Sequence, residues 1–203
     1  MTYSPKNYDR LIGLQGFSDQ LLKNHFTLYQ GYVSNANKLA EALAALSKEG
    51  KSGTPEYAEL TRRFGWEFDG MRLHELYFGN MAEGAAPLDR GSRLARKIAE
   101  QFGGVENWEK ELKAVASMRG IGWAILSLDA ENDRLFNCWI NEHDGGHLCG
   151  TTPILVLDVF EHAFMIDYGL QRAEYIKAFF KAVDWKAVAK RYDAALASRA
   201  VAP

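Results

Sequence analysis

The chain has 203 residues, of which 47% are hydrophobic and 25% are charged, a composition typical of a globular protein with a sizeable core. Its 24 basic and 26 acidic residues leave a net charge of −2, so no basic face for nucleic acid or for an anionic membrane is indicated. No apolar run approaches the roughly 18 residues of a membrane span. The polar segment MTYSPKNYDR does not resemble a signal peptide, and Cys138 and Cys149 are too few for a disulfide framework. We therefore expect a cytoplasmic protein with one compact domain or two closely packed ones.

Two long amphipathic helices are predicted first along the chain. Ser18 is a candidate N-cap for the first helix, whose inward face recurs at steps of three and four residues. That face consists of Leu22, His25, Tyr29, Tyr32, Ala36, Leu39 and Leu43. The Gly- and Pro-containing loop KEGKSGTPEY precedes a second helix with a similar face, formed by Tyr57, Leu60, Phe64, Met71, His74 and Phe78. Two long helices joined by a short loop predict an antiparallel hairpin.

A mixture of helices and strands is predicted for the rest of the chain. AEGAAPLDRG resembles a linker, so we expect a helical hairpin domain over residues 1–84 and a mixed α/β domain over residues 85–203. Helical patterns return in SRLARKIAEQF and in NWEKELKAVASM, where Asn107 is a candidate cap. GWAILSLD and LFNCWI flank the turn AENDR and predict a β-hairpin, PILVLD predicts a third strand, and residues 171–198 are helical again. The predicted fold class is α+β, with the helical hairpin followed by a small three-stranded antiparallel sheet.

An ionisable pair stands inside the apolar run LDVFEHAFMIDYG, where Asp158 precedes His162 by four residues. Burial of such groups is costly unless they are paired or bind a metal. His25 and His74 lie on the inward faces of the two long helices, where each alone could be a packed core histidine. Together, three imidazoles and one carboxylate suit iron or manganese, and zinc is not excluded. HExxH, ExxH, GxGxxG, P-loop and GxSxG motifs are absent, which disfavours other common enzyme classes.

These residues carry a resemblance to a known family. DVFEHAFMIDYG resembles the Asp/His metal-binding signature of the iron/manganese superoxide dismutases. NHFTLYQGYVSNAN and RLHELYF resemble its two histidine-bearing helices, FGGVENWEKELKAVASMRGIGWAIL resembles its bridge into the sheet, and EYIKAFFKAVDWKAVAKRY resembles its C-terminal helix. The resemblance covers nearly the whole chain. It implies conversion of superoxide to dioxygen and hydrogen peroxide at one Fe or Mn ion per chain, bound by His25, His74, Asp158 and His162. The alternatives are a non-redox metal-binding or metal-storing relative, and a structural protein on the same fold with packed histidines.

The resemblance also implies roles for residues around the metal. Trp123 matches an aromatic residue that walls the pocket, and Phe160 stands where the family usually has Trp. Glu161 matches a residue that reaches a metal-ligating histidine across a dimer interface, which implies a homodimer. Val156 lies two residues before Asp158, at a position that differs between the metal types. A bulky residue there favours iron, and use of both metals remains open.

The first helix departs from the family pattern. His25 precedes Tyr32 by seven residues, one fewer than usual, and alignment on Tyr32 would put Asn24 in the ligand position. We keep His25 as the ligand and infer that a one-residue bulge in the relatives is absent here. Tyr32 is the candidate gateway residue for protons and small anions. Tyr29 lies near a position where relatives often have His, and Met165 replaces a Tyr.

The family's usual Gln, which faces the metal-bound solvent, is missing as well. One of its two positions is Gly70, and the other falls in INEHDGG. We infer that His143 takes the role of the Gln, with His147 as the rival candidate.

Overall fold

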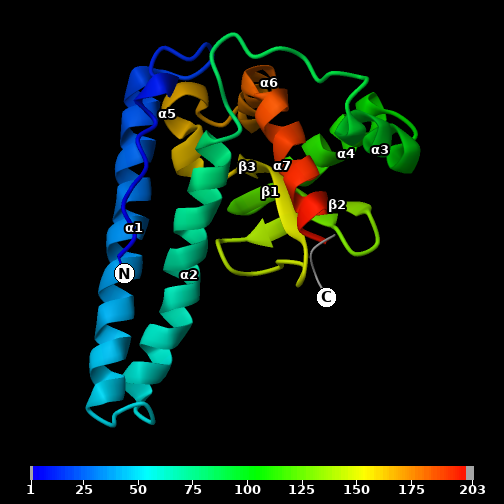
Figure 1. Ribbon diagram of the computed structural model, residues 1–203. Coiled ribbons are helices and arrows are strands. Elements are labelled where there is room, and N and C mark those ends of the chain that lie inside the picture. The colour runs from blue at the N-terminus through cyan, green and yellow to red at the C-terminus, as the bar shows by residue number, and fades with distance from the viewer. Residues whose placement is uncertain (1, 200–203) are drawn as a thin grey trace.

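The computed structural model describes residues 2–199 (Figure 1). A short 3-10 helix, η1 (Asp9–Leu11), precedes the hairpin formed by α1 (Asp19–Lys48) and α2 (Pro55–Phe78). Ser18 caps α1 as expected, because its side-chain oxygen accepts a hydrogen bond from the backbone of Leu21 at 3.1 Å. The two helices pack along their length and stand beside the rest of the molecule.

The second half of the chain forms a three-stranded antiparallel sheet with helices around it (Figure 1). Its elements are α3 (Arg93–Phe102), α4 (Val105–Ala116), β1 (Gly122–Asp129), β2 (Arg134–Asn141), β3 (Thr152–Asp158), η2 (Glu161–Ala163), α5 (Met165–Tyr168), α6 (Arg172–Ala182) and α7 (Trp185–Arg199). The strand order is β2-β1-β3, and both pairings are antiparallel. The predicted α+β fold class is therefore confirmed. Division into domains at residues 84 and 85 stays a prediction.

The expected cap of α4 is wrong. Gly104, not Asn107, is the N-cap residue of α4. The Asn107 amide instead donates to the carbonyl oxygens of Phe102 at 3.3 Å and Gly103 at 3.4 Å, at the end of α3. Gly103 is left-handed, with φ 73°, and ends α3 early enough for α4 to begin at Val105.

The central strand β1 holds Trp123 next to Asp158, the last residue of β3. Trp123 in β1 pairs with Asp158 in β3, and both side chains are completely buried. The hairpin helix α2 also packs against β3. None of the helices within residues 2–199 combines the length and the apolar character that a membrane span needs.

Candidate metal centre

Four side chains from three parts of the chain converge in the core. The Nε2 atoms of His25, His74 and His162 lie 3.2, 3.6 and 3.3 Å from one carboxylate oxygen of Asp158. One ligand atom from each residue lies within 4.8 Å of the other three. Ligands about 2.1 Å from a common ion are separated by about 3–4 Å, and the three distances to the Asp158 oxygen fall in this range.

His74 provides the clearest test of whether a metal fits. Its Nδ1 lies 2.6 Å from the carbonyl oxygen of Gly70, one helical turn earlier, to which it donates a hydrogen bond. The remaining ring nitrogen, Nε2, is then unprotonated in the neutral imidazole. That atom is buried and has no hydrogen-bond partner. A buried acceptor aimed at a carboxylate, with no donor between them, is explained by a cation held by both.

The protonation states also suit a metal site. Burial lowers the pKa of His25 and lowers that of His74 well below the usual value, so both imidazoles are neutral near pH 7. Burial alone would raise the pKa of Asp158, but the imidazoles of His162 and His25 outweigh it and lower this pKa. The other oxygen of Asp158 accepts a hydrogen bond from the backbone of Phe160 at 2.8 Å. The residues therefore offer the neutral imidazoles of His25 and His74, the further imidazole of His162 and one ionised carboxylate oxygen.

The shorter spacing in α1 leaves His25 inside the cluster. The helix runs without interruption through the segment between His25 and Tyr32. Seven residues at about 100° each complete almost two turns, so both side chains face the core. Asn24 is exposed on the other side of α1.

A hydrogen-bonded chain of three side chains lies next to the four candidate ligands. The indole N–H of Trp123 donates to Nδ1 of His143 at 3.1 Å, and Nε2 of His143 lies 2.9 Å from the Tyr32 hydroxyl. Burial lowers the pKa of His143 to about 4, so its ring is neutral near pH 7. Because Nδ1 accepts from Trp123, the ring proton lies on Nε2, and Nε2–H donates to the oxygen of Tyr32. The Tyr32 ring stacks on His74 with 5.0 Å between centroids.

Three further residues shape the pocket. The Phe160 ring stacks on His143 at 4.7 Å and on His162 at 5.1 Å between centroids. Gly70 makes room for Tyr32, since a Cβ at Gly70 would lie 2.8 Å from the tyrosine ring. Val156 is completely buried, and its carbonyl oxygen accepts a hydrogen bond from Asn80.

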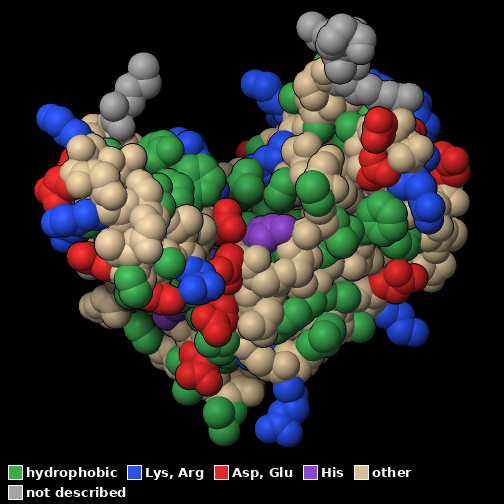
Figure 2. All heavy atoms as spheres, turned by 90° about the horizontal axis from the view of Figure 1, so that it is seen from below, with side chains coloured by type: hydrophobic (Ala, Val, Ile, Leu, Met, Phe, Trp, Pro, Cys, Tyr) green, Lys and Arg blue, Asp and Glu red, His purple; other side chains and the backbone are tan. Residues whose placement is uncertain are grey.

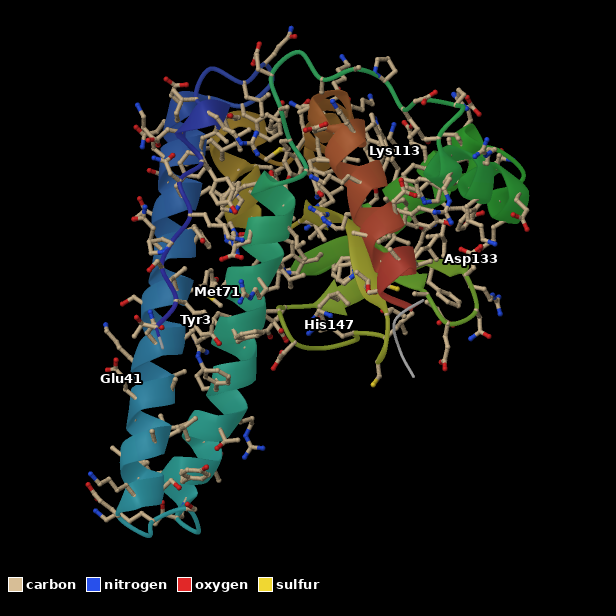
Figure 3. The ribbon with its side chains drawn as sticks, viewed as in Figure 1. Tyr3, Glu41, Met71, Lys113, Asp133 and His147 are labelled. Carbon is tan, nitrogen blue, oxygen red and sulfur yellow. The ribbon has the colours of Figure 1, made fainter. Side chains whose placement is uncertain are left out.

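His147 lies farther out. Figure 3 places it on the loop between β2 and β3, on the side that faces α2. Its Nε2 donates to the carbonyl oxygen of His143 at 2.8 Å and lies 3.7 Å from Asp69 in α2. The view from below shows histidine atoms in a hollow between two lobes of the molecule, next to acidic side chains (Figure 2). The side chain of His147 therefore bonds the backbone of His143 and faces Asp69, whereas the side chain of His143 bonds Tyr32.

Glu161 and its neighbours form an outer surface. Glu161 is exposed and lines a surface hollow together with Ile121 and Arg172. Met165 is 40% exposed and Leu170 is 93% exposed. Large apolar side chains at this exposure mark candidate contact surfaces.

Two residues make contacts that the sequence did not indicate. The Tyr29 hydroxyl donates to Glu75 at 3.1 Å and accepts from the backbone of Lys6, so it bonds outside the four-residue cluster. Trp66 was not predicted, yet its ring lies 4.4 Å from that of His143. Its position could have been inferred from the sequence spacing. Trp66 and His74 are eight residues apart, which places both on the same face of α2.

The comparisons with known proteins agree with this geometry. The family model described as iron/manganese superoxide dismutases, C-terminal domain, matches residues 90–191. A protein of Haloferax volcanii named superoxide dismutase [Mn] 2 is 39% identical over 193 residues, covering 95% of this chain and 94% of its own. A protein of Aquifex aeolicus named superoxide dismutase [Fe] is 36% identical over 197 residues, covering 95% of this chain and 92% of its own. This chain belongs to the iron/manganese superoxide dismutase family.

Proposed function

We propose that this protein is a superoxide dismutase that holds one iron or manganese ion with His25, His74, Asp158 and His162. The observation that carries the proposal is the buried, unpartnered Nε2 of His74, which faces the Asp158 carboxylate beside two further imidazoles. A packed core without metal would leave this atom unsatisfied, at a cost of about 1–3 kcal/mol. Membership of the family and the names of its relatives support the same activity.

The reaction consumes two superoxide ions and two protons and gives dioxygen and hydrogen peroxide. When bound, the metal would supply one-electron redox chemistry, so that superoxide serves in turn as reductant and as oxidant. The protein must deliver protons and admit only a small anion. We assign the proton delivery to Tyr32 and His143.

The direction of the hydrogen bonds supports this assignment. His143 donates Nε2–H to the Tyr32 oxygen, so the hydroxyl proton of Tyr32 remains free to be donated towards the metal pocket. Burial raises the pKa of Tyr32, which keeps the hydroxyl protonated at neutral pH. Trp123 and Phe160 exclude water around His143 and hold its ring in place.

We infer that iron is the preferred metal. The residues that contact the ion serve iron and manganese equally, so the preference must come from their surroundings. Val156 supports iron through its bulk at a completely buried position, two residues before Asp158. Loading the protein with each metal separately and comparing turnover per bound ion tests this inference.

We further propose a homodimer that uses the surface around Glu161. Nε2 of His162 faces the Asp158 carboxylate at 3.3 Å, which leaves Nδ1–H for a partner when Nε2 binds the metal, and the side chain is 21% exposed. A carboxylate such as Glu161 of a second copy could accept from Nδ1 and orient the imidazole. The exposed side chains of Met165 and Leu170, which follow Glu161 in the chain, are further candidates for burial in this contact.

The experiment that tests the activity combines elemental analysis with a superoxide assay on one purified sample. About one iron or manganese per chain together with turnover supports the dismutase. Bound metal without turnover instead supports the metal-storing relative, and no bound metal after reconstitution supports the structural alternative.

A further inference from the structure

His143 lies on a tight turn between β2 and β3. The turn is closed by hydrogen bonds in both directions between the backbones of Asn141 and Gly145, at 2.6 and 3.1 Å. Glu142, directly before His143, has a left-handed backbone with φ 51°. This conformation is unfavourable for a residue with a side chain and persists only when contacts hold it. Whatever holds Glu142 therefore helps to fix the position of His143, together with the contacts that the His143 ring makes with Trp123 and Phe160.

Glu142 is held by two contacts: its backbone N–H donates to the carbonyl oxygen of Ile121 at 3.1 Å, and its side chain bonds Trp66 in α2. The indole N–H of Trp66 donates to the Glu142 carboxylate at 3.0 Å, across 76 residues of sequence. Its ring meets that of His143 edge to face at 4.4 Å between centroids and lies 5.5 Å from that of Tyr32. One side chain from the hairpin thus touches both the strained residue and the histidine that follows it.

Trp66 is itself held in place on α2. The guanidinium of Arg63 lies 3.8 Å over its ring, in a cation–π contact. Arg63 also forms an ion pair at 2.7 Å with Glu67, which is 3% exposed. Since Trp66 shares α2 with the candidate ligand His74, the helix fixes the tryptophan relative to the metal site.

We propose that Trp66 is a positioning residue that secures Glu142 and thereby keeps Nε2–H of His143 within hydrogen-bond distance of Tyr32. It acts through His143 and does not touch the reacting atoms. The inference rests on the proton-delivery role proposed above for His143 and Tyr32. It predicts that loss of the link between Trp66 and Glu142 loosens the turn and slows turnover without removing the metal.

The test compares four variants of the metal-loaded protein. Trp66→Phe keeps a ring but removes the donor, and Glu142→Ala removes the acceptor from an exposed position. Glu142→Gln keeps an oxygen that can accept from Trp66. Trp139→Phe is the matched control, because Trp139 lies on β2 and its ring packs beside Gly120.

The first readout is backbone hydrogen exchange of residues 141–147, measured by mass spectrometry, and the second is kcat per bound metal. Trp66→Phe and Glu142→Ala should exchange about threefold to tenfold faster in this turn, since each loses one charge-assisted hydrogen bond. Their kcat should fall about tenfold at unchanged KM, because the donor is misplaced. Glu142→Gln and Trp139→Phe should match the wild type in both readouts.

Two results would overturn the inference. One is exchange in Trp66→Phe and Glu142→Ala that matches the Trp139→Phe control. The other is faster exchange with unchanged turnover, which would separate the turn from catalysis. If Trp66→Phe fails to fold, Glu142→Ala decides, because it alters only an exposed side chain. A wild type that binds metal but has no turnover would refute the proposed function instead, and the exchange readout would still report on the link.

Discussion

Gly70 offers the sharpest perturbation of the proposed proton path. It lies under the Tyr32 ring, where a Cβ would come within 2.8 Å of Cδ1 and 3.0 Å of Cε1. The ring has little freedom to yield, because it stacks on His74 and its hydroxyl lies 2.9 Å from His143. Gly70→Ala should therefore push Tyr32 away from His143.

The expected magnitude follows from two opposing effects. Overpacking a tight site costs about 1–3 kcal/mol. Alanine in a helix interior recovers about 1 kcal/mol relative to glycine. The net loss of about 1 kcal/mol should lower the unfolding midpoint by roughly 2–4 °C in a chain of this size.

Gly65→Ala is the matched control on the same helix, since a Cβ at Gly65 would meet nothing within 4 Å. It should raise the midpoint by a similar amount and leave turnover unchanged. Thermal unfolding and superoxide turnover of both metal-loaded variants provide the assay. A Gly70→Ala variant as stable and as active as Gly65→Ala would refute the packing argument.

Three further predictions concern other parts of the site. His143→Ala should keep most of the metal but lose turnover by about 100-fold, because a proton donor is lost. Elemental analysis and the superoxide assay check this, and wild-type turnover would remove His143 from the mechanism. Glu161→Ala should raise the dimer dissociation constant about tenfold or more, measured by analytical ultracentrifugation, and an unchanged constant would place the interface elsewhere. The unfolding midpoint should fall as the pH falls from about 7 to 5, because the native pKa values of His25 and His74 are lowered while the unfolded chain binds protons below pH about 6.5. A midpoint that is constant over this range would contradict the burial of neutral imidazoles.

Local sequence patterns were sufficient for the two long helices and the three strands, but they did not predict the short helices η1, η2 and α5 or the break between α6 and α7. The period of the inward faces predicted both long helices, and the Asp158 and His162 spacing indicated a site after the last strand. The spacing of seven residues between His25 and Tyr32 is compatible with an uninterrupted helix that turns both side chains to the core. In contrast, the cap of α4 was wrong because two consecutive glycines, Gly103 and Gly104, move the helix start ahead of Asn107.

Contacts between distant segments could not be predicted in the same way. The sequence suggested His143, but its tautomer depends on Trp123 in a neighbouring strand and its aim depends on Trp66 in α2. Such contacts depend on tertiary packing, and they produce no periodic pattern of apolar residues from which they could be predicted. The bonding of Tyr29 to Glu75 likewise depends on how the segment before α1 folds over the hairpin, and it became visible only in the structure.

The most direct test of the central claim is elemental analysis of purified wild-type protein and of Asp158→Asn, with superoxide turnover measured on the same samples. Asp158→Asn removes the negative charge that faces three histidine nitrogens while nearly preserving the side-chain shape. The account predicts about one iron or manganese per wild-type chain with turnover, and little bound metal with no turnover in the variant. Equal metal content in the two proteins, or a wild type that binds no metal after reconstitution, would contradict it.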